Sequence, residues 1–170
     1  RRSGTVTTLP TSGTARNLYS IWGTSGDLYA VGAAGTILRN NTGSWVAEVS
    51  PVATDLYDVW GSGGTVYAVG AGGAILKRSA GLWSKETSST ANSLRAIVGL
   101  PSGDLFAVGD KATLVRGSGG TWTASTDATL NMHDLRSMSL ASSGVVYLAA
   151  QSGELYSYTS GVFKLVYTSA

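Results

Sequence analysis

The chain contains no cysteine and only one histidine, His133. Disulfide bonds and thiolate metal sites are therefore excluded, and a single imidazole has no second imidazole with which to form a histidine metal cluster. The sequence also lacks a Gly-Lys-Ser or Gly-Lys-Thr phosphate-binding loop. We expect no cofactor and no metal ion in this protein.

Charged residues and long apolar runs are also scarce. Charged residues make up 13% of the 170 residues, and 12 Lys plus Arg against 10 Asp plus Glu leave a formal net charge of +2. Because no basic block is present, nucleic-acid binding is not expected. No apolar run approaches the roughly 20 residues of a membrane span, so no membrane insertion is expected. The chain begins with Arg1 and Arg2 instead of Met, and we expect a processed product or part of a longer protein.

What the chain does contain is glycine and large aromatic residues at regular intervals, with 23 Gly, 8 Tyr and 5 Trp. Self-comparison divides most of the chain into four similar units of about 40 residues, a period typical of solenoid and propeller repeats. The units are residues 17 to 54, 55 to 92, 93 to 133 and 134 to 170. The last unit is the most divergent.

The four units keep the same apolar positions. The units open with Leu18, Leu56, Leu94 and Leu135, continue with the aromatic residues Tyr29, Tyr67, Phe106 and Tyr147 and then with Ile37, Ile75, Leu114 and Leu155, and close with Trp45, Trp83, Trp122 and Phe163. The closing aromatic residue follows the third group by eight residues in every unit, a constancy that indicates a true repeat.

Each unit contains four short runs rich in Val, Ile, Tyr, Trp and Thr, separated by Gly and Ser clusters. Such runs predict strands and such clusters predict hairpin turns. In the first unit we expect strands near residues 17 to 22, 27 to 32, 35 to 39 and 44 to 49. Helices are not expected, because glycine recurs every few residues and no segment keeps a helical apolar spacing.

Four antiparallel strands in about 40 residues are typical of one blade of a β-propeller. A lone four-stranded sheet leaves apolar faces wet, so each blade must pack against its neighbours. The predicted fold class is all-β, a single propeller domain over residues 1 to 170 with four four-stranded blades, as a fragment or half of a larger ring.

Ring closure depends on an extra segment at the start of the chain. Residues 3 to 9, within a predicted strand and linker at 3 to 16, occupy the place of a preceding unit's fourth strand. The fourth unit supplies its own closing strand around residues 162 to 167. The extra strand therefore pairs with an edge of the last blade, or it is the remnant of another blade. Alternatively two chains join into one larger ring, because unpaired strand edges favour association.

Residues 18 to 38 follow the pattern L-x-x-I-W-G-x-S-G-D-L-Y-A-V-G-x-x-G-x-I-L, and a G-x-W turn ends at Trp45. This pattern resembles the propeller repeats of large myxobacterial surface or secreted proteins, and more distantly the Ycf48-like and Asp-box propellers. The turns before Trp45, Trp83 and Trp122 resemble the Asp-box hairpin but lack its aspartate. The resemblance implies the propeller fold, an extracellular or cell-surface setting, and hairpins that serve structure and not glycosidase activity.

Arg39, Lys77 and Arg116 occupy the same position in the first three units, where the fourth unit has Ser157. Equivalent positions in a propeller lie around one axis, so these residues could form an arc of positive charge that holds an acidic polysaccharide or an acidic protein. The alternative is that they are solvated residues near strand ends, which discourage edge aggregation.

Trp22 and Trp60 also correspond to each other, and they are the second candidate pair for binding. Exposed indoles stack on sugars or anchor partner proteins. Core packing between blades is the alternative explanation. We expect the closing tryptophans to be structural.

Evidence for catalysis is weak in this sequence. Glycoside hydrolysis needs two carboxylates close together, and Asp27, Asp104, Asp55 and Asp134 fall instead at repeat-equivalent turns, which Asp commonly shapes. We expect His133 to lie in a surface loop.

We therefore expect a non-catalytic binding or scaffolding module at a cell surface, with a protein partner or self-association. The alternative is a carbohydrate-binding, lectin-like propeller, and the third hypothesis is a glycosidase-like enzyme.

Overall fold

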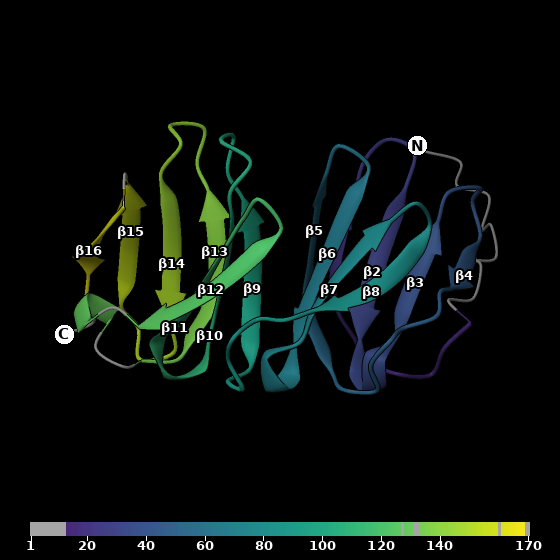
Figure 1. Ribbon diagram of the computed structural model, residues 1–170, viewed down its shortest axis with the longest axis horizontal. Helices are drawn as coiled ribbons and strands as arrows, with labels where there is room; N and C mark the ends of the chain where they lie inside the picture. Colours follow the sequence, from purple (N-terminus) through teal and green to yellow (C-terminus); the bar gives the residue numbers. More distant parts are fainter. Residues whose placement is uncertain (1–12, 127, 131–132, 160, 169–170) are drawn as a thin grey trace, which may run out of the picture.

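The computed structural model describes residues 13 to 168, with the exception of residues 127, 131, 132 and 160. The extra strand predicted at residues 3 to 9 lies outside the described residues. The chain is an all-β propeller of four blades, each an antiparallel sheet of four strands in sequence order. Figure 1 shows the blades following one another along the long axis, with the first and last at opposite ends.

Each blade coincides with one sequence repeat. Blade 1 consists of β1 (Leu18–Gly23), β2 (Leu28–Gly32), β3 (Ile37–Asn40) and β4 (Trp45–Ala47). Blade 2 consists of β5 (Leu56–Ser62), β6 (Thr65–Gly70), β7 (Ile75–Ser79) and β8 (Leu82–Glu86). Blade 3 consists of β9 (Leu94–Gly99), β10 (Leu105–Gly109), β11 (Thr113–Ser118) and β12 (Thr121–Thr126). Blade 4 consists of β13 (Leu135–Leu140), β14 (Val146–Ala150), β15 (Leu155–Thr159) and β16 (Val162–Tyr167), so the predicted closing strand is confirmed.

Short 3-10 turns between the second and third strands are the main difference from the predicted strands. They are η1 (Ala33–Gly35), η2 (Ala71–Gly73) and η3 (Asp110–Ala112), and a fourth, η4 (Ala128–Leu130), follows β12. The third strand of blade 1 therefore begins at Ile37 and not at residue 35. The middle residue of η1 has a positive φ of 51°, and blade 2 places Gly72 there, the residue that adopts this conformation most easily. In the described part of the chain, no helix is long and apolar enough to cross a membrane.

The apolar core lies between the blades and not within one sheet. Separate clusters of buried side chains fill the interfaces of blades 1 and 2, of blades 2 and 3, and of blades 3 and 4. The opening leucines show the effect: Leu56 and Leu94 are 0% exposed, whereas Leu18, at the front of blade 1, is 41% exposed. Burial against the preceding blade removes this apolar surface from water and stabilises the stack.

Candidate functional site

Blades 1 and 2 are joined at their outer edge by a partly buried acid. The indole Nε1 of Trp83 donates a hydrogen bond of 2.6 Å to Glu48 Oε2, just after β4 of the neighbouring blade. The guanidinium of Arg78 binds the same carboxylate through two hydrogen bonds of 2.8 and 2.7 Å. The Glu48 hydrogen bond raises the pKa of Arg78 above the usual value for arginine. We call this arrangement, an acid of one blade accepting from the closing indole of the next, the clasp.

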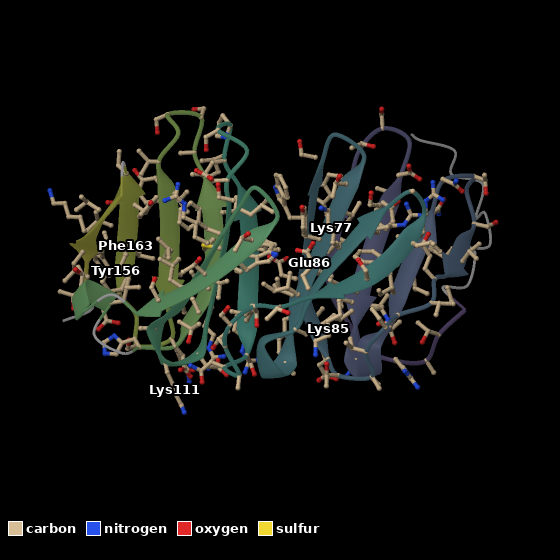
Figure 2. The ribbon with its side chains drawn as sticks, viewed as in Figure 1. Lys77, Lys85, Glu86, Lys111, Tyr156 and Phe163 are labelled. Carbon is tan, nitrogen blue, oxygen red and sulfur yellow. The ribbon has the colours of Figure 1, made fainter. Side chains whose placement is uncertain are left out.

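Blades 2 and 3 repeat the clasp. Trp122 Nε1 donates a hydrogen bond to Glu86 Oε2, and Lys77 Nζ lies 3.9 Å from Glu86 Oε1. Figure 2 shows Lys77 and Glu86 close together on blade 2. The Trp122 ring also meets Tyr67 edge to face, with centroids 5.9 Å apart. The acid and the indole therefore tie these two blades as they do blades 1 and 2.

Blades 3 and 4 lack both halves of the clasp. Leu114 is paired with Ser125 in the register in which Ile75 is paired with Glu86, so a serine stands where the acid belongs. Phe163 replaces the closing tryptophan, and its ring has no N–H to donate. A groove of about 610 Å³ opens here, and its lining includes Phe106, Arg116, Thr121, Thr123, Ser125, Tyr158 and Phe163.

The floor of this groove is a row of three aromatic rings. Tyr158 lies between the other two, with its centroid 4.8 Å from Phe106 and 4.7 Å from Phe163. Phe163 is labelled in Figure 2, beside Tyr156 on blade 4. Aromatic rings provide large apolar contact area in a fixed geometry. Phe106 and Phe163 are only 3% and 7% exposed, so the partly buried Tyr158 supplies most of the accessible apolar surface of this floor.

One cation lies over this floor. The side chain of Arg116 is 54% exposed, and its guanidinium carbon lies 5.9 Å from the Phe106 centroid. Arg116 Nη2 donates to Asp104 Oδ2 at 2.9 Å, and this hydrogen bond lowers the pKa of Asp104. A guanidinium carries five N–H donors, so a bond to one carboxylate oxygen leaves donors for a ligand. The groove thus combines an apolar floor with a group that recognises carboxylates.

The three predicted cations do not form an uninterrupted positive arc, because each has an acidic neighbour. Arg39 Nη2 lies 2.7 Å from Asp27, whereas the neighbours of Lys77 and Arg116 are the acids described above. Each cation also lies 5.9 Å from the aromatic ring of its own blade's second strand. Among the three, Arg116 has the most exposed side chain and lines the groove.

Trp22 and Trp60 lie between blades. A Cβ on Gly61 would come within 2.6 Å of the Trp22 ring, and a Cβ on Gly99 within 2.0 Å of the Trp60 ring. Each indole therefore packs on the bare glycine backbone of the next blade. Blades 3 and 4 use Val98 and Leu140 at these two positions.

The four predicted turn aspartates hold four different partners. Asp27 and Asp104 face arginines of their own blades, as described. Asp55 Oδ1 accepts the backbone N–H of Ala34 at 2.8 Å, and Asp134 Oδ1 accepts that of Lys111 at 2.9 Å. Lys111 is visible at the lower edge in Figure 2. Each of these two acids connects its blade to the η turn of the preceding blade.

His133 has two polar neighbours that sequence reasoning did not find. Its Nδ1 lies 2.7 Å from Ser152 Oγ and 3.1 Å from Glu154 Oε2. A serine, histidine and acid relay uses the two ring nitrogens separately, whereas here both neighbours meet the same nitrogen. The hydrogen bond from Ser152 and the nearby imidazole lower the pKa of Glu154.

Two further polar clusters between blades were also missed. The partly buried Asp58 carboxylate accepts hydrogen bonds from Ser20 Oγ at 2.7 Å and from the backbone N–H of Ile97 at 2.9 Å, and thereby links three blades. Desolvation raises the pKa of Asp58. The sequence did contain a signal for this cluster: Asp58 has a carboxylate at a position where the other units have the small residues Ser20, Ala96 and Ser137.

The second of these clusters combines Asp110 with two arginines. Arg95 binds Asp110 through two hydrogen bonds of 2.9 and 3.0 Å and lies 4.2 Å from the Tyr57 centroid. Arg136 Nη1 reaches the same carboxylate at 3.3 Å. The Arg95 hydrogen bond lowers the pKa of Asp110. Both arginines directly follow opening leucines, which was the signal in the sequence.

No protein-family model and no curated protein sequence matches the chain. Solved structures with a similar fold include a catalytically inactive virginiamycin B lyase from Staphylococcus aureus with quinupristin, with TM-score 0.80 and 15% identity. Ycf48 bound to a D1 peptide has TM-score 0.65 and 18% identity, and the WD40 β-propeller domain of Doa1 has TM-score 0.67 and 16% identity.

These three similarities cover 92%, 88% and 85% of this chain but only 57%, 52% and 50% of the other chains. The chain thus spans about half the length of these propellers. At such identities the likeness concerns the fold, and all three are similar to this chain as β-propellers.

Proposed function

We propose that this protein is a non-catalytic binding module that holds an extended, acidic segment of a partner protein in the groove between blades 3 and 4. The observation that carries the proposal is the paired replacement of acid and indole by Ser125 and Phe163. The other two interfaces have a clasp at these positions, whereas here a groove lies over an aromatic floor.

The groove matches the chemistry of a peptide with one acidic and one apolar side chain. Arg116 supplies the charged donor, and Tyr158, which packs on the buried rings of Phe106 and Phe163, supplies the apolar surface. The hydroxyl groups of Thr121, Thr123 and Ser125 lie on the same lining and suit the polar backbone of an extended chain. The similar propeller Ycf48, solved bound to a D1 peptide, supports a protein partner by analogy.

We place this module at a cell surface, as part of a larger surface or secreted protein of the myxobacterial type. The support is the repeat pattern of residues 18 to 38. The protein partner that supplies the acidic segment can also be a second copy of this chain. The test below includes oligosaccharides, so that glycan binding can be distinguished from peptide binding.

The test is an array of short synthetic peptides, each acidic peptide matched with its amidated, uncharged counterpart. Peptides that bind are then titrated calorimetrically. Binding should depend on the carboxylate, and Arg116→Gln should weaken it by about tenfold, the usual cost of losing a charged hydrogen bond. Arg39→Gln, the same change at the equivalent position of blade 1, should leave binding unchanged.

A second variant tests the space itself. Ser125→Glu combined with Phe163→Trp restores the clasp and should abolish binding while the fold, followed by circular dichroism, is kept. Equal binding by this variant, equal loss in the Arg39 control, or binding of an oligosaccharide array but no peptide would each refute the proposal. Steady hydrolysis of a bound peptide or glycan would contradict its non-catalytic part.

A further inference from the structure

We propose that the front face of blade 1 is an interface for a further blade of the same repeat, one that carries Trp and Glu at the positions of Trp22 and Glu48. The face of each blade that packs on the preceding blade is called its front face, and the opposite face its back face. The proposal concerns this face alone and is independent of the groove.

The interfaces within the chain fall into two types. The first type occurs twice and has an indole on a glycine together with a clasp; its residues are Trp22, Gly61, Glu48 and Trp83 in one interface, and Trp60, Gly99, Glu86 and Trp122 in the other. The second type, between blades 3 and 4, changes all four residues together, to Val98, Leu140, Ser125 and Phe163. Because the four change as a set, the residues of one face specify the type of neighbour that fits it.

The front face of blade 1 carries the receiving half of the first type. Gly23 stands at the position of Gly61, and Trp45 at the position of Trp83. Among the described residues, none accepts a hydrogen bond from Trp45, whereas Trp83 donates to Glu48. Leu28 fills the space beside Gly23, because a Cβ on Gly23 would lie 2.4 Å from Leu28 Cδ2. The indole of a preceding blade would displace this leucine side chain.

Apolar exposure at this face supports a missing neighbour. Leu18, Ile21 and Leu28 are 41%, 62% and 39% exposed. The equivalent residues of blade 2, Leu56, Val59 and Val66, are 0%, 4% and 3% exposed because blade 1 covers them. A further sheet of the same repeat packed on blade 1 would bury Leu18, Ile21 and Leu28 in the same way.

The back face of blade 4 does not provide the matching half. Ser139 is paired with Tyr147 in the register in which Trp22 is paired with Tyr29, so a hydroxymethyl group stands in place of the indole. Tyr167 is paired with Leu155, in the register that pairs Glu86 with Ile75, so no carboxylate is available for Trp45. A second copy of this chain therefore lacks both contacts, and the occupant is a blade of the kind of blades 1 and 2.

The experiment inserts a second copy of residues 17 to 54 between Arg16 and Asn17 of the full chain. In this extended protein, Glu48→Gln in the inserted copy and Trp45→Phe in the original copy are made singly and together. Urea unfolding should show coupling between them of about tenfold in the unfolding equilibrium constant, as expected for a charge-assisted hydrogen bond. The matched control insert carries Trp22→Ser and Glu48→Tyr, and it should show less cooperative unfolding and a lower midpoint.

A second variant tests the same face without an insertion. Ser139→Trp with Tyr167→Glu gives blade 4 of the natural chain the missing residues, and light scattering should then detect concentration-dependent head-to-tail association, weakened by Trp45→Phe. Absence of coupling in the insert together with a monomeric double variant would overturn the proposal. Association of the unmodified chain that Trp45→Phe abolishes would also overturn it, because blade 4 would then be the occupant.

Discussion

Glu48 and Trp83, 35 residues apart in the chain, are joined by a hydrogen bond of 2.6 Å between the outer edges of two blades. The side chain of Glu48 is only 17% exposed, so its charge needs compensation, which Arg78 provides through two further hydrogen bonds. A buried carboxylate that loses its partners is strongly destabilising. This contact therefore acts as a selective tie between neighbouring blades, and its presence or absence distinguishes the interfaces.

The first prediction compares the two clasps. Glu48→Gln should lower the free energy of unfolding by about 2 kcal/mol, because it leaves the Arg78 guanidinium without its counter-charge. Glu86→Gln should cost less, since Lys77 lies 3.9 Å away and forms a weaker pair. Urea unfolding followed by tryptophan fluorescence measures both. An equal or larger loss for Glu86 would contradict this account of the clasp.

The second prediction concerns the contact of Trp60 with Gly99. Gly99→Leu should destabilise the protein by about 3 kcal/mol, because a side chain there collides with the indole. Adding Trp60→Val should recover much of the loss, since the pair then matches Val98 and Leu140 of the next interface. Thermal unfolding of the single and double variants shows whether the changes compensate. Additive losses would show that glycine is required for another reason.

The third prediction concerns the turns that connect successive blades. Asp55→Ala should lower the free energy of unfolding by about 1 kcal/mol, because the Ala34 N–H loses its acceptor. Asp27→Ala, which removes a partly exposed ion pair with Arg39, should cost less. Chemical unfolding of both variants at one ionic strength provides the comparison. The interpretation fails if the Asp27 variant has the lower free energy of unfolding.

The fourth prediction is a pair of opposite pH dependences. The pKa of Asp110 is lowered from its ordinary value of 3.8, chiefly by Arg95, so its contribution to stability is complete above that value and is lost as the pH falls through the folded pKa. The pKa of Asp58 is raised by burial, so its contribution is greatest at low pH and declines as the pH rises above 3.8.

Urea unfolding as a function of pH checks these signs. Asp110→Asn should flatten the loss of stability in acid, and Asp58→Asn should remove the decline at higher pH. The second variant should also be less stable throughout, because an amide cannot accept from all the donors around Asp58. A steeper acid loss in the Asp110 variant would contradict the assignment.

Much of the fold was predictable because the same apolar positions recur in all four units. Short runs rich in Val, Ile, Tyr, Trp and Thr and glycine-rich turns define strands locally, and four equivalent copies leave few arrangements that bury them. The 3-10 turns were missed because they depend on a positive φ at Ala34 and Lys111, residues that rarely signal that conformation. Arg116 was a candidate from its position, but Tyr158 and Phe163 entered the site only through their proximity in space.

The sequence by itself determined the strands, the number of blades and the equivalence of their positions, because these follow from spacing along the chain. Only the tertiary structure decided which equivalent residues differ in role. Glu48 and Glu86 each form a clasp and Ser125 does not, because each acid acts only through the side chain of the next blade that faces it. Such pairings join residues more than 30 positions apart, so the spacing of residues within one repeat does not predict them.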